Sequence, residues 1–346
     1  MLQTKWANKR KWIMMGLAAV LILSMLSGCG KKTDKAVSSV VATYKGGQVT
    51  QQEFDVYKGV LAFLDPQMQQ AVGEATIQER LLDQLIGFKI LESQASDKVK
   101  TDTKPKVKTQ MDQFSALFTT DAAKKSRDDQ LKTLGITLDD VQKYVERSMI
   151  VMDEYKSKVT DEQIKSQYDQ NVKSDPYYYV NASVRHILIA LQGRTKDAAL
   201  ARAKEVRDKL EKGGDFTALA KEYSDDPGSK DKGGLYENVD VMNWVPGFKE
   251  AAATLPINEI SQPVETTYGY HIIKVESRTT KALADVKDDL STQIASGNIN
   301  DYITKTLPPL IEKVSLPTPS PTPAASGALA ASAAPTPAAA SPSPTK

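Results

Sequence analysis

The stretch YGYHIIKV, residues 268–275, has the apolar and β-branched composition that is typical of a buried strand, yet it contains a histidine. A similar stretch, VRHILIA, occupies residues 184–190. These two stretches hold His186 and His271, the only histidines of the chain. Because side chains alternate between the two faces of a strand, each histidine shares a face with apolar neighbours. The pattern predicts two strands, each with a histidine on its buried face.

The two histidines allow two interpretations. A buried neutral imidazole needs hydrogen-bond partners for both ring nitrogens, because an unsatisfied buried polar group is costly. On neighbouring strands, His186 and His271 can bond each other or share a threonine or tyrosine hydroxyl. The pair is then either a structural polar contact or part of a functional site, and the two strands alone do not decide between them.

The elements around these strands predict a small α+β domain. A helix after the first strand ends at Gly213 and Gly214, a usual C-terminal stop, and Asp215 is placed to cap a second helix. A polar, glycine-rich loop and a short helix, VPGFKEAAATL, follow. EISQPVE and YGYHIIKV then predict two strands joined by a turn, with a further short strand after Gly234. This order fits helices packed on an antiparallel sheet.

Four blocks of this region carry a family resemblance: HILI, GGDFTALAKEYSDDPGSKDKGG, VPGF and QPVETTYGYHIIKV. With these blocks in order, the chain from about Val180 to Arg278 resembles the parvulin family of peptidyl-prolyl isomerases. The resemblance implies a four-stranded antiparallel sheet with helices and a site that isomerises Xaa-Pro bonds, with no cofactor and no metal. By position in the family's motifs, it also implies the catalytic residues His186, Asp226, Thr266 and His271.

The resemblance further implies an apolar pocket for the proline ring, with Leu235, Trp244 and Phe248 as substrate-binding residues. Trp244 stands where the family commonly has methionine, and GGLYENV replaces the common stretch GGDLG. A bulkier residue at position 244 would narrow the pocket. These departures keep a second function open, that of a holdase chaperone whose parvulin domain is weakly active or inactive.

The segments on both sides of this domain are predicted to be helical. Helix starts are marked by three capping boxes and one further N-cap: Thr50–Glu53, Thr76–Glu79, Thr160–Gln163 and Thr137. VATYKGGQVT predicts a short strand and turn before the first helix. Apolar residues recur at helical spacing, and such stripes are either core or a groove for a client chain. Residues 281–314 are also expected to be helical and to pack on the N-terminal helices.

The whole layout resembles the PrsA-type foldase lipoproteins of Gram-positive bacteria. The expected fold is therefore α+β, with a parvulin domain inserted in a mainly helical, SurA-like chaperone lobe. The expected segments are a lipoprotein signal peptide at 1–28, a polar linker at 29–37, the helical lobe at 38–176, the parvulin domain at 180–278, C-terminal helices at 281–314 and a disordered Pro/Ala/Ser tail at 315–346.

The two ends of the chain predict export and anchoring. A basic segment precedes an apolar run that is shorter than the roughly 20 residues of a transmembrane helix. The run ends in LSGC, which looks like a lipobox with Cys29, the only cysteine, as the lipidated residue. The alternative is an uncleaved anchor helix. The tail consists almost entirely of Pro, Ala, Ser and Thr, and is either a spacer or without function.

Composition and motifs exclude other classes. The net charge is +2 and no basic block follows the first dozen residues, so a nucleic-acid partner is not expected. GGDF at 213–216 occurs in cyclic-dinucleotide synthases, but a helix stop followed by a helix cap explains it here. The chain lacks a P-loop, a nucleophile elbow and a third metal ligand at motif spacing, and its helical N-terminal region does not suit a solute-binding lipoprotein. The expected partners are unfolded or partly folded exported proteins with Xaa-Pro bonds, at the outer face of the cytoplasmic membrane, and a homodimer stays open.

Overall fold

The structure, a computed structural model, describes residues 39–316. The predicted signal peptide, Cys29, the polar linker and the tail from residue 317 lie outside these residues. The described residues form two compact units. Unit 1 holds those up to Met149 and from Ile303 onward, and unit 2 holds Ile150–Tyr302. Within residues 39–316, no helix combines the length and the apolar character needed to cross a bilayer.

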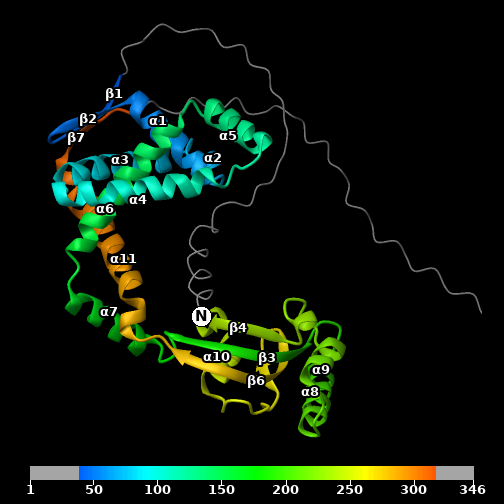
Figure 1. Ribbon diagram of the computed structural model, residues 1–346. Coiled ribbons are helices and arrows are strands. Elements are labelled where there is room, and N and C mark those ends of the chain that lie inside the picture. Colours follow the sequence, from blue (N-terminus) through cyan, green and yellow to red (C-terminus); the bar gives the residue numbers. More distant parts are fainter. Residues whose placement is uncertain (1–38, 317–346) are drawn as a thin grey trace, which may run out of the picture. The chain divides into compact units, whose positions relative to one another are not determined.

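Unit 1 contains a three-stranded sheet built from both ends of the described chain. β1 (Val40–Tyr44) and β2 (Gly47–Thr50) form a hairpin, where the sequence predicted one short strand and a turn. Gly46 in its turn has a φ of +100°, a conformation that favours glycine. β7 (Ile311–Val314) pairs antiparallel with the other edge of β1, which gives the order β2-β1-β7 (Figure 1).

Helices make up most of the rest of unit 1. They are α1 (Gln51–Leu64), α2 (Met68–Ala71), α3 (Ala75–Gln94), α4 (Asp97–Ser115), α5 (Asp121–Thr133) and the first part of α6 (Leu138–Ser157). The predicted Thr50–Glu53 capping box is confirmed, because each side chain accepts the other residue's backbone N–H, at 3.2 and 3.0 Å. Thr137 caps α6 as predicted. The box predicted at Thr76 is wrong, because α3 begins one residue earlier and Thr76 lies inside its first turn.

The apolar stripes of unit 1 differ in exposure. Leu82 and Ile86 on α3 are fully buried, so this stripe is core. The stripe at the end of α4 is less covered. There Phe114 and Phe118 lie edge to face with centroids 5.3 Å apart, and Leu117 is 49% exposed. The groove hypothesis therefore concerns the end of α4 and not α3.

The sheet of unit 2 is the predicted four-stranded antiparallel sheet, in the order β4-β3-β6-β5. Its strands are β3 (Val180–Ala190), β4 (Leu235–Asp240), β5 (Val264–Thr266) and β6 (Gly269–Thr280). The strand expected after Gly234 is β4. EISQPVE forms a strand only after Pro263, which has no N–H for the ladder. β3 pairs with β6 along its whole length, with His186 opposite Ile273 and His271 opposite Leu188.

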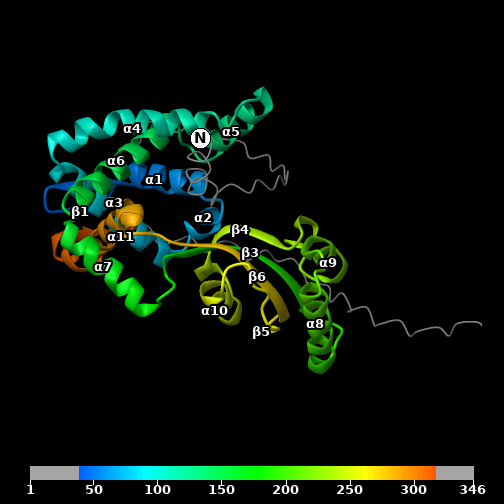
Figure 2. The same ribbon diagram turned by 60° about the horizontal axis from the view of Figure 1, so that its bottom comes forward.

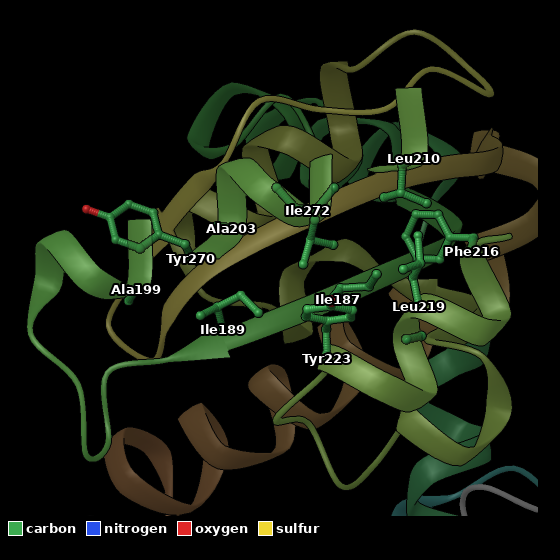
Figure 3. Packing of buried hydrophobic residues seen from close by; sticks show 12 residues of the cluster. Ile187, Ile189, Ala199, Ala203, Leu210, Phe216, Leu219, Tyr223, Tyr270 and Ile272 are labelled. Atoms are coloured by element: carbon green, nitrogen blue, oxygen red, sulfur yellow. The ribbon is translucent and has the colours of Figure 1, made fainter. Parts of the chain in front are cut away.

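One face of this sheet is covered by α8 (Lys196–Glu211) and α9 (Phe216–Tyr223). Figure 3 shows side chains of both helices packed on Ile187, Ile189 and Ile272, which are fully buried. The segment between the helices behaves as predicted from GGDF: Gly213 has a φ of +87°, and Asp215 caps α9 by accepting a backbone N–H at 2.8 Å.

The other face is covered by α10 (Pro246–Thr254), which lies over Val184, Ile273 and Val275. Figure 2 shows α8 and α9 at one part of the sheet and α10 at another. Since His186 and His271 adjoin Ile187 and Ile272 in sequence, strand alternation places both histidines on the α10 face. The predicted burial of both is confirmed, with exposures of 3% and 4%.

Two further helices of unit 2 flank the sheet in sequence. α7 (Asp161–Ser174) starts at the predicted Thr160–Gln163 capping box, and α11 (Leu283–Asp301) packs on it through Ile164, Val286 and Leu290. The prediction that helices continue to Val314 is wrong. A π-helical turn and a 3-10 turn at Pro308–Leu310 end the helical segment, because proline cannot continue a helix, and strand β7 follows.

Candidate active site

The two histidine rings contact each other on the α10 face of the sheet. Nδ1 of His186 lies 3.1 Å from Nδ1 of His271, and the ring planes are inclined by only 27°. Their opposite nitrogens also have partners: Nε2 of His271 lies 2.9 Å from the hydroxyl of Thr266, and Nε2 of His186 lies 2.9 Å from Oδ2 of Asp226. The four residues predicted to be catalytic therefore form one continuous chain of hydrogen bonds.

Asp226 is held by the loop after α9, which is tied to β3. Ser224, fully buried, accepts the backbone N–H groups of Leu188 and Asp226, both at 3.2 Å. The carboxylate of Asp225 accepts the N–H of Ala190 at 2.9 Å and pairs with Arg194 at 2.6 Å. These bonds fix the loop to the strand that carries His186, which explains why a residue distant in sequence lies at its ring.

The Asp226 carboxylate has several donors. Besides His186, Oδ2 accepts the hydroxyls of Ser229 and of Tyr236, the latter at 3.0 Å, and Oδ1 accepts the N–H of Gly228 at 3.1 Å. The His186 hydrogen bond, helped by those of Ser229 and Gly228, holds the pKa of Asp226 well below its usual range, against the opposing effect of burial. Asp226 is therefore a carboxylate at neutral pH.

An ionised Asp226 fixes the direction of every hydrogen bond when both rings are neutral. The carboxylate only accepts, so Nε2–H of His186 donates to it and Nδ1 of His186 accepts from Nδ1–H of His271. Nε2 of His271 then accepts the Thr266 hydroxyl proton, and Thr266 in turn accepts the N–H of Tyr268 at 3.1 Å. All four ring nitrogens are satisfied, as buried polar groups require.

His271 is held in its neutral form. Burial, and after it the charge of the neighbouring His186 ring when protonated, lowers the pKa of His271 to about 3. A proton on His271 would put a donor against Thr266 and add a charge inside the core. His271 therefore stays uncharged through the neutral pH range.

Aromatic rings form a wall beside the histidines. Phe248 of α10 is only 4% exposed and lies edge-on to both histidine rings. Its ring centroid is 5.2 Å from that of His186 and 5.1 Å from that of His271. Trp244, half-buried, packs 5.0 Å from Phe248. The predicted substrate-binding residues Trp244 and Phe248 are thus brought to the predicted catalytic residues.

Leu235 is not brought to the site. It pairs with Arg185, so it lies on the α8 and α9 face, whereas Tyr236 pairs with Val184 on the face of the histidines. The Tyr236 ring stacks on His186 at 5.4 Å and 25°. A residue-by-residue comparison of GGLYE with the family's GGDLG gives the same answer, since the leucine position falls on Tyr236. That comparison was the available signal for Tyr236, whereas nothing in the sequence pattern singled out Ser229 or Ser224.

Comparison with known proteins agrees with this geometry. The rotamase family, a PPIC-type PPIase domain, matches residues 186–277. Foldase protein PrsA 3 of Bacillus cereus is 31% identical over 301 residues, which cover 86% of this chain and 88% of that protein. The chain belongs to the PrsA foldase family.

Two further proteins similar to this PrsA-family chain are also PrsA proteins. Foldase protein PrsA of Caldanaerobacter subterraneus is 28% identical over 319 residues, covering 88% of this chain and 94% of that protein. The crystal structure of PrsA from Bacillus subtilis is 28% identical, covers 80% of this chain and 92% of its own, and has a TM-score of 0.25. The predicted family and enzyme class are confirmed: this PrsA-family protein is a foldase with a parvulin-type peptidyl-prolyl isomerase domain.

Proposed function

We propose that the isomerase site consists of His186, Asp226, Thr266 and His271 beside an apolar wall of Phe248, Trp244 and Tyr236, with Tyr236 in place of Leu235. The substrates are Xaa-Pro bonds in unfolded or partly folded exported proteins. The observation that supports this assignment is the hydrogen-bond chain from Thr266 to Asp226, which ends in a carboxylate beside a cluster of aromatic rings.

Isomerisation needs no bond to break. The Xaa-Pro amide rotates over a barrier of about 18–20 kcal/mol, which exists because resonance stabilises the planar forms. The enzyme accelerates the rotation by binding the twisted amide better than either planar form. Twisting makes the carbonyl less polar, so an apolar wall of Phe248 and Trp244 favours the twisted state and holds the proline ring while the rest of the peptide turns.

Asp226 supplies a fixed negative charge next to that wall. A carboxylate is a poor nucleophile toward an amide, so its role is electrostatic and orienting. The electric field of the carboxylate acts on the amide dipole as the carbonyl rotates. Because several donors hold the carboxylate in place, it need not reorient during the rotation. The two histidines and Thr266 keep the carboxylate's partner ring in one tautomer.

The test is isomerase activity of the full chain on a proline peptide. Asp226→Ala is expected to lower kcat/KM on the order of 10–100-fold, because it removes the charge at the site. Asp231→Ala, which removes an exposed carboxylate of the same loop, is the matched control and should retain activity. Full activity of a folded Asp226→Ala protein would show that the site lies elsewhere.

A holdase function is the second candidate, and the exposed Leu117 beside Phe114 and Phe118 favours it. Such a surface can bind apolar segments of a client chain. If it acts independently of the isomerase site, the Asp226→Ala protein should still suppress aggregation of an unfolded client, while Leu117→Ser should weaken this suppression and leave isomerisation unchanged. An unchanged holdase activity in Leu117→Ser would reject this surface.

The location and organisation of the chain complete the proposal. Residues 1–28 act as a lipoprotein signal peptide, Cys29 carries the lipid, and the mature protein is anchored on the outer face of the cytoplasmic membrane. Residues 38–176 and 281–314 are proposed as a chaperone lobe into which 180–278 is inserted. The β1–β7 pairing supports the return of the chain to this lobe, whereas residues 150–176 and 281–302 group with the parvulin sheet in unit 2. Cys29→Ser should abolish incorporation of labelled fatty acid. A homodimer is testable by sedimentation of the full chain.

A further inference from the structure

Tyr236 joins the two parts of the site that are otherwise separate. Its ring stacks on His186 at 5.4 Å and belongs to the aromatic wall, while its hydroxyl donates to Oδ2 of Asp226 at 3.0 Å. Burial, together with the nearby negative charge of Asp226, raises the pKa of Tyr236 to about 12, so the phenol keeps its proton and remains a donor. The other wall residues differ: Phe248 has no polar side-chain atom, and Trp244 packs on the Phe248 ring.

The donors are unevenly shared between the two oxygens of Asp226. Oδ2 receives His186, Ser229 and Tyr236, whereas Oδ1 receives only the backbone N–H of Gly228. Three donors from three different segments hold one oxygen, so the carboxylate cannot turn about its side-chain torsions without losing a bond. The second oxygen keeps acceptor capacity for a substrate.

The neighbouring backbone leaves room for this hydroxyl. A Cβ placed on Gly228 would lie 2.6 Å from the Tyr236 oxygen, closer than real Cβ contacts allow. The loop that carries Asp226 therefore accommodates the phenol only because position 228 is glycine. In the family's common stretch GGDLG, the residue at the position of Tyr236 is leucine, which can form part of an apolar wall but has no hydroxyl.

We propose that Tyr236 is a positioning residue of the isomerase, whose ring serves as part of the proline wall while its hydroxyl holds the Asp226 carboxylate in its working orientation. The inference rests on the proposed function of the same site and adds a residue that acts through Asp226. It predicts that the ring and the hydroxyl of Tyr236 can be separated by mutation.

The experiment compares Tyr236→Phe, Tyr236→Leu and Tyr270→Phe in the full chain. Tyr270 is the matched control, because it lies on the opposite face of the sheet and its hydroxyl bonds the carboxylate of Glu265 at 3.4 Å. NMR exchange measurements on a proline peptide give the rate of isomerisation in the complex and the dissociation constant separately. Thermal unfolding of each variant shows that it is folded.

Tyr236→Phe is expected to lower the rate in the complex by about threefold to tenfold, the range for losing one ordinary hydrogen bond, because His186 and Ser229 still hold the carboxylate. The dissociation constant should stay within about twofold. Tyr236→Leu should show the same loss of rate and also weaker binding, because the stacked ring is gone. Tyr270→Phe should match the unmodified protein. A Tyr236→Phe protein with an unchanged rate, or a loss confined to the dissociation constant, would overturn the inference.

A double-mutant cycle in unfolding stability tests whether the hydroxyl acts through Asp226. Tyr236→Phe should cost less in the Asp226→Ala background than alone, because the acceptor is already absent. Equal costs in both backgrounds would overturn the inference. Failure of the proposed function is a different result: Asp226→Ala would then keep full isomerase activity whatever the Tyr236 variants do.

Discussion

β3 and β6 present two buried faces made from neighbouring residues of the same strands, and these faces differ in chemistry. On the α8 and α9 side, Ile187 and Ile272 pack among apolar side chains and are fully buried. On the α10 side, His186 and His271 stand one residue away in each strand, equally inaccessible, with every ring nitrogen hydrogen-bonded.

The difference shows what each face is built to do. Apolar side chains on the α10 face would stabilise the sheet without needing any hydrogen bond. A buried polar pair, in contrast, needs all its hydrogen-bond partners in place to avoid a loss of stability. The α8 face therefore contributes mainly stability, and the α10 face gives up some of it to hold a polar chain in one orientation. Three substitutions or conditions test this contrast.

Ile272→Ala should have the largest effect on stability. Deleting most of a fully buried isoleucine side chain leaves a cavity and costs about 2–5 kcal/mol of unfolding free energy, while kcat/KM of the folded molecules stays unchanged. Urea denaturation and the isomerase assay measure both. Ile257→Ala, at a position that is 43% exposed, is the control and should cost little. A large loss of activity in folded Ile272→Ala would mean that the two faces are not separate in function.

Lowering the pH should weaken the α10 face specifically. The pKa of His271 is about 3 in the folded protein and near 6.5 when unfolded, so the unfolded chain binds more protons between these values. Stability from His271 is fully present above pH 6.5 and is lost as the pH falls toward 3, by up to about 1.4 kcal/mol per pH unit. Asp226, whose pKa is also lowered, adds loss in the same direction at the acid end.

His271→Leu is the control for this pH dependence. Denaturation curves between pH 7 and pH 4.5 should be flatter for His271→Leu than for the unmodified protein, because the titrating group is gone. Identical slopes would mean that His271 is not the group that is held neutral.

Thr266→Val should have the smallest effect, a loss of about 1–2 kcal/mol, because it removes one donor from Nε2 of His271 and keeps the shape of the side chain. Isomerase activity should fall as well, since Thr266 no longer fixes the tautomer of His271 and, through it, that of His186. Thr267→Val, in the exposed turn next to it, is the comparison. If both variants behave alike, Thr266 does not belong to the hydrogen-bond chain that matters.

The sequence sufficed for the features that depend on local patterns. Alternation predicted that His186 and His271 each lie on the buried face of a strand. The family's motifs led to Asp226 and Thr266, which the structure brings into contact with them. Leu235, predicted as a wall residue, lies on the other face of the sheet for a physical reason. A shift of one residue turns a strand's side chains to the opposite face, and only pairing with β3 sets that register.

Other misses share this dependence on distant partners. Ile311–Val314 is too short to show its own periodicity, and it becomes a strand because β1 offers an unpaired edge. Ser229 gave no signal because its role depends on how the loop folds back toward His186. Thr76 satisfied the capping pattern, yet α3 begins one residue before it, since a capping motif marks a start only where the preceding residues are not helical.

The pairing of β7 with β1 has a consequence for the order of folding. Unit 2 is a single continuous stretch, so it can fold as soon as the chain up to Tyr302 is free to do so. Unit 1 cannot complete its sheet at that moment, because Ala42 of β1 pairs with Val314 of β7, near the far end of the described chain. A two-stranded hairpin is marginally stable, and its free edge can pair with other chains. A chain that becomes available from its N-terminus therefore passes through a stage in which unit 2 can be folded while β1 still lacks its second neighbour, β7.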